Sequence, residues 1–564
     1  MIKKRILALA VSSVFLTACD DTETETVEVT KEVVKEVEVV KEVSPEEVTK
    51  VKNVILMIGD GMGAQQVGLL EEYARRAPNS TYNNSGNKTA LSKLGDAGHV
   101  GLSLNAPFGP DGSLVVDSAC SATQLATGMA AGSEMVGLDV EGNVVETILE
   151  KAKKQGKATG LVSDTRITHA TPAAFASHQP HRSLEPEIAY ELVSNNMVDV
   201  LLSGGARVFL PENIKTDEAA RKVMADLGAH ESVYKKSKRG DDRNIIIEAK
   251  EKYGYGLAFD KTQLAGSESN KLLGLFANSG MADGIAYSAC KADDSCTQPS
   301  LKEMTLKALD ILSKDEDGFF LMIEGGQIDW AGHINDAGWM LHELLKFDEA
   351  VAAVYDWVKE RNDTLVLVTA DHETGSFGFS YSRKDLPEGK MLDGNGMQNR
   401  EYKPNFNFGP LSNLDKLYAQ TGTFYDIMGA VNSDWDFTNT TGQQWSDAIN
   451  SVSEFKVSPE QAESITKRED NEYHVHEHKY LKATEFPAIA DFKEFYVYGD
   501  ELHGNLIGRT LAADQNVVWG TGTHTAAPVP VYAFGPAGVT KQFSTMQHHV
   551  EIGQKMMAAL LTEQ

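Results

Sequence analysis

The sequence has few cysteines and a deficit of basic side chains. Only four of its 564 residues are cysteine, so the fold is not a scaffold built from disulfides. Lysine and arginine number 53 against 81 aspartates and glutamates, which gives a net charge of −28. Such a surface repels the phosphates of nucleic acids, and we expect no nucleic-acid-binding module. With 41% hydrophobic and 24% charged residues, the chain is instead typical of a large folded body.

The first 18 residues have the layout of a secretory signal. Three basic residues at positions 3–5 precede an apolar run from Ile6 to Leu16. That run is shorter than the roughly 20 residues that a spanning helix needs, which favours a cleaved signal (1–18) over the alternative of a membrane-spanning anchor. The segment Leu16-Thr-Ala-Cys19 resembles the lipobox of bacterial lipoproteins. This resemblance implies a lipid on Cys19 and a periplasmic protein, and Asp20 resembles the signal that retains such proteins at the inner membrane.

Residues 19–50 are strongly acidic and carry a recurring Val-Glu-Val or Lys-Glu-Val unit. Their valines do not follow a clean heptad, so we interpret the segment as an extended acidic tether, with a coiled coil as the alternative. Further along the chain, Cys290 and Cys296 are close in sequence and would lie in an oxidising compartment. We predict a small disulfide loop there, with two free thiols as the alternative.

Three apolar runs end in acidic side chains. They begin at Asn53, Phe319 and Thr364, and each has the continuous hydrophobic character of a strand that is covered on both faces. The acids at or just after their ends are Asp60, Glu324, Asp329 and Asp371. Burying several carboxylates together is costly unless cations neutralise them. A metal cluster at the carboxyl ends of parallel strands is therefore the prediction.

Amphipathic segments that suit covering helices lie between these strands, at 119–129, 146–155, 301–313 and 342–361. Alternating strands and helices predict an α/β fold, a doubly wound three-layer α/β/α sandwich with a large, mostly parallel central sheet. We expect one catalytic body over 51–564. Residues 376–518 have few long periodic elements and are predicted to be a large insertion within it.

Several short patterns carry possible chemistry but are weak one at a time. Asp329-x3-His333 and Asp371-His372 offer oxygen and nitrogen ligands of the kind that Zn²⁺ prefers, although an isolated Asp-x3-His is usually a surface pair. Ser118 precedes a run of small residues that would start a helix, so it could be a nucleophile at a helix N-terminus or simply the helix cap.

Six blocks taken in order resemble the active-site blocks of the bacterial alkaline phosphatases. They are Gly59-Asp60-Gly-Met-Gly, Asp117-Ser118-Ala, His169-Ala-Thr171-Pro-Ala-Ala with Arg182, Glu324-Gly-Gly-Gln-Ile-Asp329-x3-His333, Thr369-Ala-Asp371-His372 and Gly522-Thr-His524-Thr. The resemblance covers most of 51–375 and 515–564. It does not extend over the tether or much of the predicted insertion.

The resemblance implies three cation sites and a mechanism. It assigns a first Zn²⁺ site to Asp329, His333 and His524, a second Zn²⁺ site to Asp60, Asp371 and His372, and a third, Mg²⁺ site to Asp60, Thr171 and Glu324. Ser118 would be the nucleophile, and Arg182 would bind two phosphoryl oxygens as a planar fork. The implied activity is hydrolysis of many phosphate monoesters through a phosphoserine, and the family resemblance also implies a homodimer.

Two positions depart from the best-known enterobacterial member of that family, which has Asp and Lys where this sequence has His169 and Trp330. We expect neither side chain to bind a metal directly. His169 could contact the water ligands of the third ion and favour another metal there, such as Co²⁺. Trp330 could cover the phosphate through a water molecule or simply pack.

Other candidates are weaker. The alternating His474, His476 and His478 could form an extra metal site, although an exposed polar strand is the preferred interpretation. Cys120 is predicted to be a buried small residue rather than a nucleophile. Asp164 and Arg166 are expected to form an ordinary surface pair.

Two other functions stay open from the sequence. A superfamily relative could cleave diesters, sulfates or phosphonates, but the Ser118 block with Arg182 argues against that. An envelope-anchored binding protein that has lost catalysis is the alternative from another class, and the complete set of predicted ligands argues against it.

Overall fold

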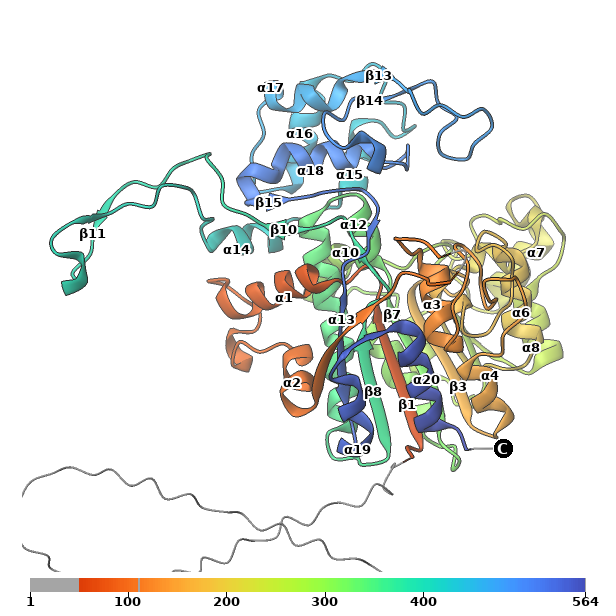
Figure 1. Cartoon of the computed structure of the whole chain (residues 1–564). Helices are drawn as coiled ribbons and strands as arrows, with labels where there is room; N and C mark the ends of the chain where they lie inside the picture. Colours follow the sequence, from red (N-terminus) through yellow and green to blue (C-terminus); the bar gives the residue numbers. More distant parts are fainter. Residues whose placement is uncertain (1–49, 110–111, 563–564) are drawn as a thin grey trace, which may run out of the picture. The chain divides into compact units, whose positions relative to one another are not determined.

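The computed structural model describes residues 50–109 and 112–562 (Figure 1). The predicted signal, Cys19 and all of the predicted tether except Lys50 lie outside the described residues. None of the helices within the described ranges is long and apolar enough to cross a membrane.

A ten-stranded sheet forms the centre of the fold, in the order β18-β2-β17-β8-β1-β7-β3-β4-β6-β5. The three predicted strands are β1 (Asn53–Gly59), β7 (Phe319–Gly325) and β8 (Thr364–Thr369), and they are neighbours in the middle of the sheet. Both pairs are parallel. Only β17 runs antiparallel to its neighbours β2 and β8, so the prediction of a mostly parallel sheet is confirmed.

The remaining strands of the sheet are β2 (His99–Leu104), β3 (Ala158–Arg166), β4 (Val200–Gly204), β5 (Gly256–Ala258), β6 (Leu272–Leu275), β17 (Val529–Phe534) and β18 (Met546–His548). The helices around it are α1 (Ala64–Arg76), α2 (Ala90–Ala97), α3 (Ser118–Thr127), α4 (Ile148–Lys154), α5 (Ala170–Ala173), α6 (Glu185–Ser194), α7 (Glu218–Asp226), α8 (Ile245–Tyr253), α9 (Lys261–Gly266), α10 (Gly284–Ala292), α11 (Leu301–Leu312), α12 (Gln327–His333), α13 (Ala337–Val358), α19 (Ala537–Thr540) and α20 (His549–Leu560).

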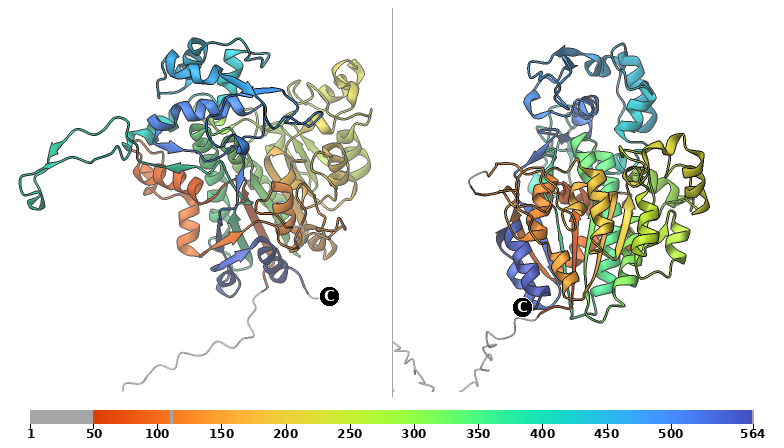
Figure 2. Two further views of the ribbon diagram at one scale, coloured as in Figure 1. Left: turned by 45° about the horizontal axis from the view of Figure 1, so that its top comes forward. Right: turned by 90° about the vertical axis from the view of Figure 1, so that its right-hand side faces the viewer.

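Both faces of the sheet are buried under helices (Figure 2). In β1, Ile55 and Met57 belong to one hydrophobic core, which also holds side chains of α11 and α13. Their neighbours Val54, Leu56 and Ile58 belong to a second core, with side chains of α3, α4 and α20. Successive residues of a strand point to opposite faces, so an uninterrupted apolar run fits this double burial. The predicted three-layer α/β/α sandwich is thus confirmed.

The four predicted helices are α3, α4, α11 and α13, with small differences at their ends. The largest difference is at α13, which begins at Ala337 rather than at 342. Asp336 caps this helix, because its carboxylate accepts a hydrogen bond from the backbone N–H of Trp339.

Residues 376–518 contain more regular structure than their sequence suggested. The helices there are α14 (Ser412–Tyr418), α15 (Phe424–Val431), α16 (Gly442–Val452), α17 (Pro459–Ala462) and α18 (Leu502–Gln515). The longest of them, α18, has 14 residues and was not predicted from the sequence. Its glycines and polar residues are buried along with its leucines, and this hides the apolar periodicity that marks an amphipathic helix. Whether 376–518 is an insertion stays a prediction.

The short strands complete the described elements. They are β9 (Glu373–Thr374), β10 (Gly378–Phe379), β11 (Lys390–Met391), β12 (Glu401–Tyr402), β13 (Arg468–Asp470), β14 (Glu485–Pro487), β15 (Val517–Val518) and β16 (His524–Thr525).

Two local predictions can be compared directly with the structure. His474, His476 and His478 lie in exposed turns between β13 and β14, so the expectation of a polar strand was wrong. No potential metal group of the described residues includes them. The disulfide between Cys290 and Cys296 is confirmed.

Candidate active site

The carboxyl ends of β8, β1 and β7 bring the predicted acids together. Ile58 of β1 is in register with Glu324 of β7 on one side and with Thr369 of β8 on the other. Asp60 and Asp371 both follow two residues after those register positions. Because parallel strands end at the same edge of a sheet, the three carboxylates meet there, and all three are fully buried.

Three groups of side chains in the described ranges could each hold a metal ion. Within each group, the ligand atoms lie within 4.8 Å of one another. These groups are Asp60–Asp371–His372, Asp329–His372–His524 and Asp60–His169–Glu324. The group Asp60–Asp371–His372 consists of the residues that were assigned above to the second Zn²⁺ site. Asp60 belongs to two groups, as expected for a carboxylate between two ions.

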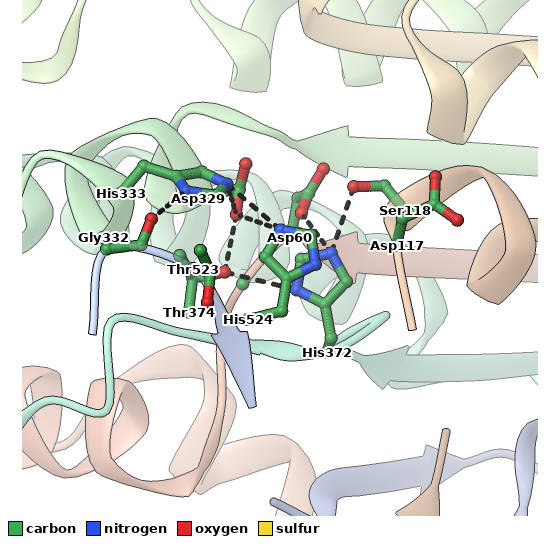
Figure 3. Close-up of polar contacts among 12 residues, drawn as sticks. Asp60, Asp117, Ser118, Asp329, Gly332, His333, His372, Thr374, Thr523 and His524 are labelled. Carbon is green, nitrogen blue, oxygen red and sulfur yellow. Dashed lines mark hydrogen bonds and ion pairs between the residues drawn. The ribbon is translucent and has the colours of Figure 1, made fainter. Parts of the chain in front are cut away.

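The side chains predicted for the first site also lie together (Figure 3). Asp329 and His333 come from the same helix, α12, and His333 Nε2 is 3.4 Å from Asp329 Oδ1. His524 Nε2 is 3.1 Å from His333 Nε2 and 3.6 Å from Asp329 Oδ1. The Nδ1 atoms of the two histidines bond the carbonyl oxygens of Gly522 and Val116, at 2.7 and 2.8 Å. Both rings therefore turn Nε2 toward Asp329, which is typical of metal ligands.

The third site differs in part from the prediction. Thr171 Oγ1 lies 3.4 Å from Asp60 Oδ2, as expected. His169, which was expected only to contact water ligands, lies with Nδ1 at 3.9 Å from Glu324 Oε1. Its ligand atom is close enough to Asp60 and Glu324 to share an ion with them. The structure thus brings a histidine nitrogen beside a set that the sequence predicted to consist of oxygens, and the assignment of the ligands stays a prediction.

Four buried atoms of these groups have no hydrogen-bond partner within the described part of the chain: Asp60 Oδ1, His169 Nδ1, Glu324 Oε1 and Asp371 Oδ2. Buried polar atoms are almost always paired, so their convergence fits divalent cations. Burial, with the neighbouring carboxylates, raises the pKa of Asp371 to about 8 and that of Asp60 well above its usual value. Cations would supply the positive charge that keeps these groups ionised.

Ser118 is the first residue of α3, and its hydroxyl faces the second site. Ser118 Oγ lies 3.1 Å from His372 Nε2, and the side chain is buried (Figure 3). The cap of this helix is Asp117, whose carboxylate accepts hydrogen bonds from the backbone N–H groups of Ala119 and Cys120. The interpretation of Ser118 as a cap was therefore wrong, and its hydroxyl is free to face the metal ligands.

Arg182 lies at the same end of the site as Ser118. One terminal nitrogen of its guanidinium is 3.0 Å from Asp117 Oδ2, and the other is 3.3 Å from His169 Nε2. These contacts fix the plane of the guanidinium, which leaves a pre-oriented pair of donors for an oxyanion.

Trp330 packs beside the third site. Its ring meets that of His169 edge to face with 6.0 Å between centroids, and the guanidinium of Arg166 lies 5.9 Å from its centre. Arg166 pairs with Glu185 at 2.8 Å rather than with Asp164. Asp164 is 2% exposed and faces Lys346, so the prediction of an ordinary surface pair between Asp164 and Arg166 was wrong.

Several side chains that orient the predicted ligands had no signal in the sequence. Thr374 Oγ1 donates to Asp329 Oδ1 at 2.6 Å and lies 3.2 Å from His372 Nδ1. Ser121 Oγ and His549 Nε2 both bond the carbonyl oxygen of Asp371. Hydroxyl and imidazole groups of this kind are common throughout a chain, so only the fold identifies them.

Cys120 is buried, as predicted, and its sulfur lies 3.2 Å from the carbonyl oxygen of Ala131. Burial raises the pKa of its thiol, which keeps the sulfur protonated and unreactive.

The chain is similar to known proteins of one family. The family model described as alkaline phosphatase matches residues 51–562. Alkaline phosphatase 3 of Bacillus subtilis is 31% identical over 91% of this chain and 89% of its own length. Alkaline phosphatase 4 of the same organism is 36% identical, but the match covers 58% of this chain and 62% of that protein, which is less than two thirds of it.

Two solved structures share the fold. The alkaline phosphatase of Thermus thermophilus has a TM-score of 0.68 at 22% identity and covers 91% of this chain and 92% of its own. A cold-active alkaline phosphatase of Shewanella sp. has a TM-score of 0.61 at 24% identity and covers 90% of this chain and 100% of its own.

Proposed function

The chain belongs to the alkaline phosphatase family of phosphatase enzymes, and we propose that it hydrolyses many kinds of phosphate monoester through a phosphoserine intermediate on Ser118. The observation that carries this proposal is the position of Ser118 Oγ, 3.1 Å from His372 Nε2. His372 Nε2 lies in turn 3.5 Å from Asp60 Oδ1 and 3.3 Å from Asp371 Oδ2. These short distances between Ser118 and the proposed metal ligands support Ser118 as the nucleophile.

We assign Zn²⁺ to the first and second sites, because their nitrogen and carboxylate donors suit this ion. The third site, which we assign to Mg²⁺ with Co²⁺ as the alternative, would use Asp60, Thr171 and Glu324. The nearby His169 nitrogen favours a softer ion than Mg²⁺. When bound, these cations would favour the alkoxide form of serine and stabilise the charge of the phosphoryl group and the departing oxygen.

The side chains have distinct tasks in the proposed reaction. Ser118 Oγ attacks phosphorus as its hydroxyl proton is lost, and the bond to the ester oxygen breaks in line with the attack. The departing alkoxide takes a proton from solvent. Water then attacks the phosphoserine and breaks the bond to Ser118 Oγ, which regains a proton as inorganic phosphate leaves. Two in-line displacements give net retention at phosphorus.

Arg182 would bind two phosphoryl oxygens, because its guanidinium is a planar fork already held by Asp117. Neither Arg182 nor Ser118 contacts the leaving group in this arrangement, so the alcohol or phenol portion of the ester is only weakly selected. Broad specificity follows from this division of contacts.

The test is hydrolysis of an aryl phosphate monoester at alkaline pH, before and after chelation, with Zn²⁺ and then Mg²⁺ or Co²⁺ restored. We expect activity to disappear with the chelator and to return with Zn²⁺. Whichever of Mg²⁺ and Co²⁺ then restores more activity is the native ion of the third site. A phosphate diester in parallel separates this proposal from diester cleavage. No monoesterase activity with any of these metals would refute the proposed function.

We also propose a lipid on Cys19, a periplasmic location at the inner membrane, and a homodimer. The lipobox-like segment Leu16–Cys19 and Asp20 support the first two, and the disulfide between Cys290 and Cys296 suits an oxidising compartment. The family resemblance supports the dimer. Replacing Cys19 with Ser should release the protein from membranes, and light scattering measures the mass in solution.

A further inference from the structure

The end of β3 is irregular where it passes the third site. Val162 is in register with Leu202 of β4, but the next register pair joins Arg166 to Gly204, so three residues of β3 lie opposite one of β4. On its other side, β3 stays in register with β7 as far as Ser163 and Glu324. Bulges of this kind redirect side chains near functional sites. Here the segment Ser163–Asp164–Thr165 faces the turn between β7 and α12.

Each residue of this segment bonds either Glu324, near the end of β7, or the residues that follow β7. The hydroxyls of Ser163 and Thr165 both donate to Glu324 Oε2. Asp164 Oδ1 accepts the backbone N–H of Gly326 at 2.7 Å, and the carbonyl oxygen of Asp164 accepts from Gln327 Nε2 at 2.9 Å. Glu324 Oε1 has no hydrogen-bond partner in residues 50–109 and 112–562, and it lies beside Asp60 and His169.

The turn has little room to move. A Cβ atom added at Gly326 would lie 2.5 Å from Thr165 Cγ2 and 2.9 Å from the carboxyl carbon of Glu324. Close packing and the hydrogen bond to Asp164 therefore fix the backbone at Gly326, which lies two residues after Glu324 and three before Asp329.

Asp164 is itself held by a buried charged group on α13. Lys346 Nζ lies 3.1 Å from Asp164 Oδ2 and 2.6 Å from Glu343 Oε2. All three side chains are 4% exposed or less. Although burial acts to lower the pKa of Lys346, the two carboxylates raise it above its usual value, so the ammonium group stays charged. Removing one partner from such a group is far more disruptive than removing an exposed pair.

The other carboxylate of this group bonds different partners. Glu343 Oε1 accepts from Trp339 Nε1 at 2.7 Å and from the backbone N–H of Gly284 at 2.5 Å. Asp164 and Glu343 are therefore equally buried and share Lys346, but only Asp164 contacts the turn that carries Glu324.

We propose that Asp164 is a positioning residue for the third cation site: it fixes the turn between β7 and α12 so that Glu324 Oε1 faces Asp60 and His169, and Lys346 holds Asp164 in that position. The inference rests on the proposed function, because the third site is part of it. Replacing a residue that hydrogen-bonds a metal ligand typically lowers metal affinity by about 10- to 100-fold. A charged acceptor for the Gly326 N–H is also stronger than a neutral one.

The test compares Asp164→Asn with Glu343→Gln in the full-length protein reconstituted with Zn²⁺. Each variant leaves Lys346 with one carboxylate, so each keeps one buried pair and the shape of the side chain. Titration calorimetry with Mg²⁺, and separately with Co²⁺, measures third-site affinity, and thermal unfolding measures stability. We expect Asp164→Asn to weaken binding by about tenfold or more. We expect Glu343→Gln to lose stability but to bind the ion like the wild type.

Asp164→Ala extends the series, since it removes the acceptor entirely and should bind the ion more weakly than Asp164→Asn. If Asp164→Asn is too unstable to purify, Gln327→Met replaces it, since this variant removes the hydrogen bond from Gln327 Nε2 to the carbonyl oxygen of Asp164. Unchanged ion affinity in Gln327→Met would then refute the positioning role. Wild-type affinity in Asp164→Asn, or equal weakening in Glu343→Gln, would also refute it. If the wild type binds neither Mg²⁺ nor Co²⁺ in addition to Zn²⁺, the proposed third site is wrong. That result would refute this part of the proposed function, whatever the variants show.

Discussion

Removing the metals should make the stability of this protein fall as pH rises, because the ligand cluster then holds protons that the unfolded chain does not. Burial raises the pKa of Asp371 from 3.8 to about 8. Despite burial, Asp329 raises the pKa of His333 from 6.5 to about 9. Both folded-state values exceed the unfolded ones, so the stability that these groups contribute is complete below the unfolded pKa and is lost as pH rises toward the folded pKa.

The interval from pH 6.5 to 8 lies between the unfolded and folded pKa values of Asp371 and His333, and Glu324, whose pKa burial raises to about 7, adds to the loss. Each of the two groups then keeps its proton only in the folded state, and each costs about 1.4 kcal/mol per pH unit. Since His333 of the unfolded chain is half protonated at pH 6.5, and Asp371 of the folded chain is half protonated at pH 8, the two groups together predict a loss of about 3 kcal/mol across the interval. With about 2.1 cal/mol/K of unfolding entropy per residue, a folded body of this length should lose about 3 °C in Tm. His524 does not contribute, because burial lowers its pKa to about 4, so that its titration lies below this interval.

The assay is thermal unfolding of the chelated and the metal-reconstituted protein at both pH values. A buried acid away from the cluster, such as Asp336, whose pKa burial raises to about 7, changes both forms equally and cancels in the comparison. The metal-reconstituted protein should lose less Tm than the chelated protein over this interval, since cations hold the carboxylates ionised and His333 neutral. A chelated protein that is as stable at pH 8 as at pH 6.5, or a parallel decline in both forms, would refute the reasoning.

Four further predictions concern single groups. Ser118→Ala should lose the phosphoserine and most turnover while its Zn²⁺ content, measured by mass spectrometry, stays unchanged; near-normal turnover would contradict the mechanism. Arg182→Lys should raise the inhibition constant for inorganic phosphate by about tenfold or more, because a point charge replaces a planar fork. His169→Asp should shift third-site preference in calorimetry from Co²⁺ toward Mg²⁺, since an oxygen replaces a nitrogen; an unchanged preference would exclude His169 from that site. Replacing Cys290 and Cys296 with Ser should cost about 2 kcal/mol in urea unfolding, as expected for so short a loop.

The central strands of the fold, and the sheet edge at which the predicted ligands meet, could be predicted from the sequence because both depend on local patterns. An uninterrupted apolar run such as Asn53–Gly59 predicts a strand buried on both faces, and the residues that follow it must lie at the sheet edge. The spacing of Asp329 and His333 places both on one face of a short helix for the same local reason.

What the sequence did not predict depends on contacts between distant segments. Asp164 looked like a surface residue because nothing near it in the sequence indicates Lys346, on a helix far along the chain. Likewise, α18 was missed because its polar and small side chains are buried against other elements rather than exposed. The adjacent Asp117, and not Ser118, caps α3, and two neighbouring cap-forming residues cannot be ranked from their types alone.

The three carboxylates that are predicted to bind metal share one arrangement of their two oxygens. In Asp60, Oδ2 faces the Thr171 hydroxyl while Oδ1 has no partner among the described residues. In Asp371, Oδ1 accepts backbone N–H groups while Oδ2 is unpartnered, and Glu324 likewise has Oε2 bound and Oε1 unpartnered. Each carboxylate is thus held by one oxygen and presents the other. A donor that fixes the first oxygen determines where the second one points, so changing these donors should alter metal affinity without touching a ligand.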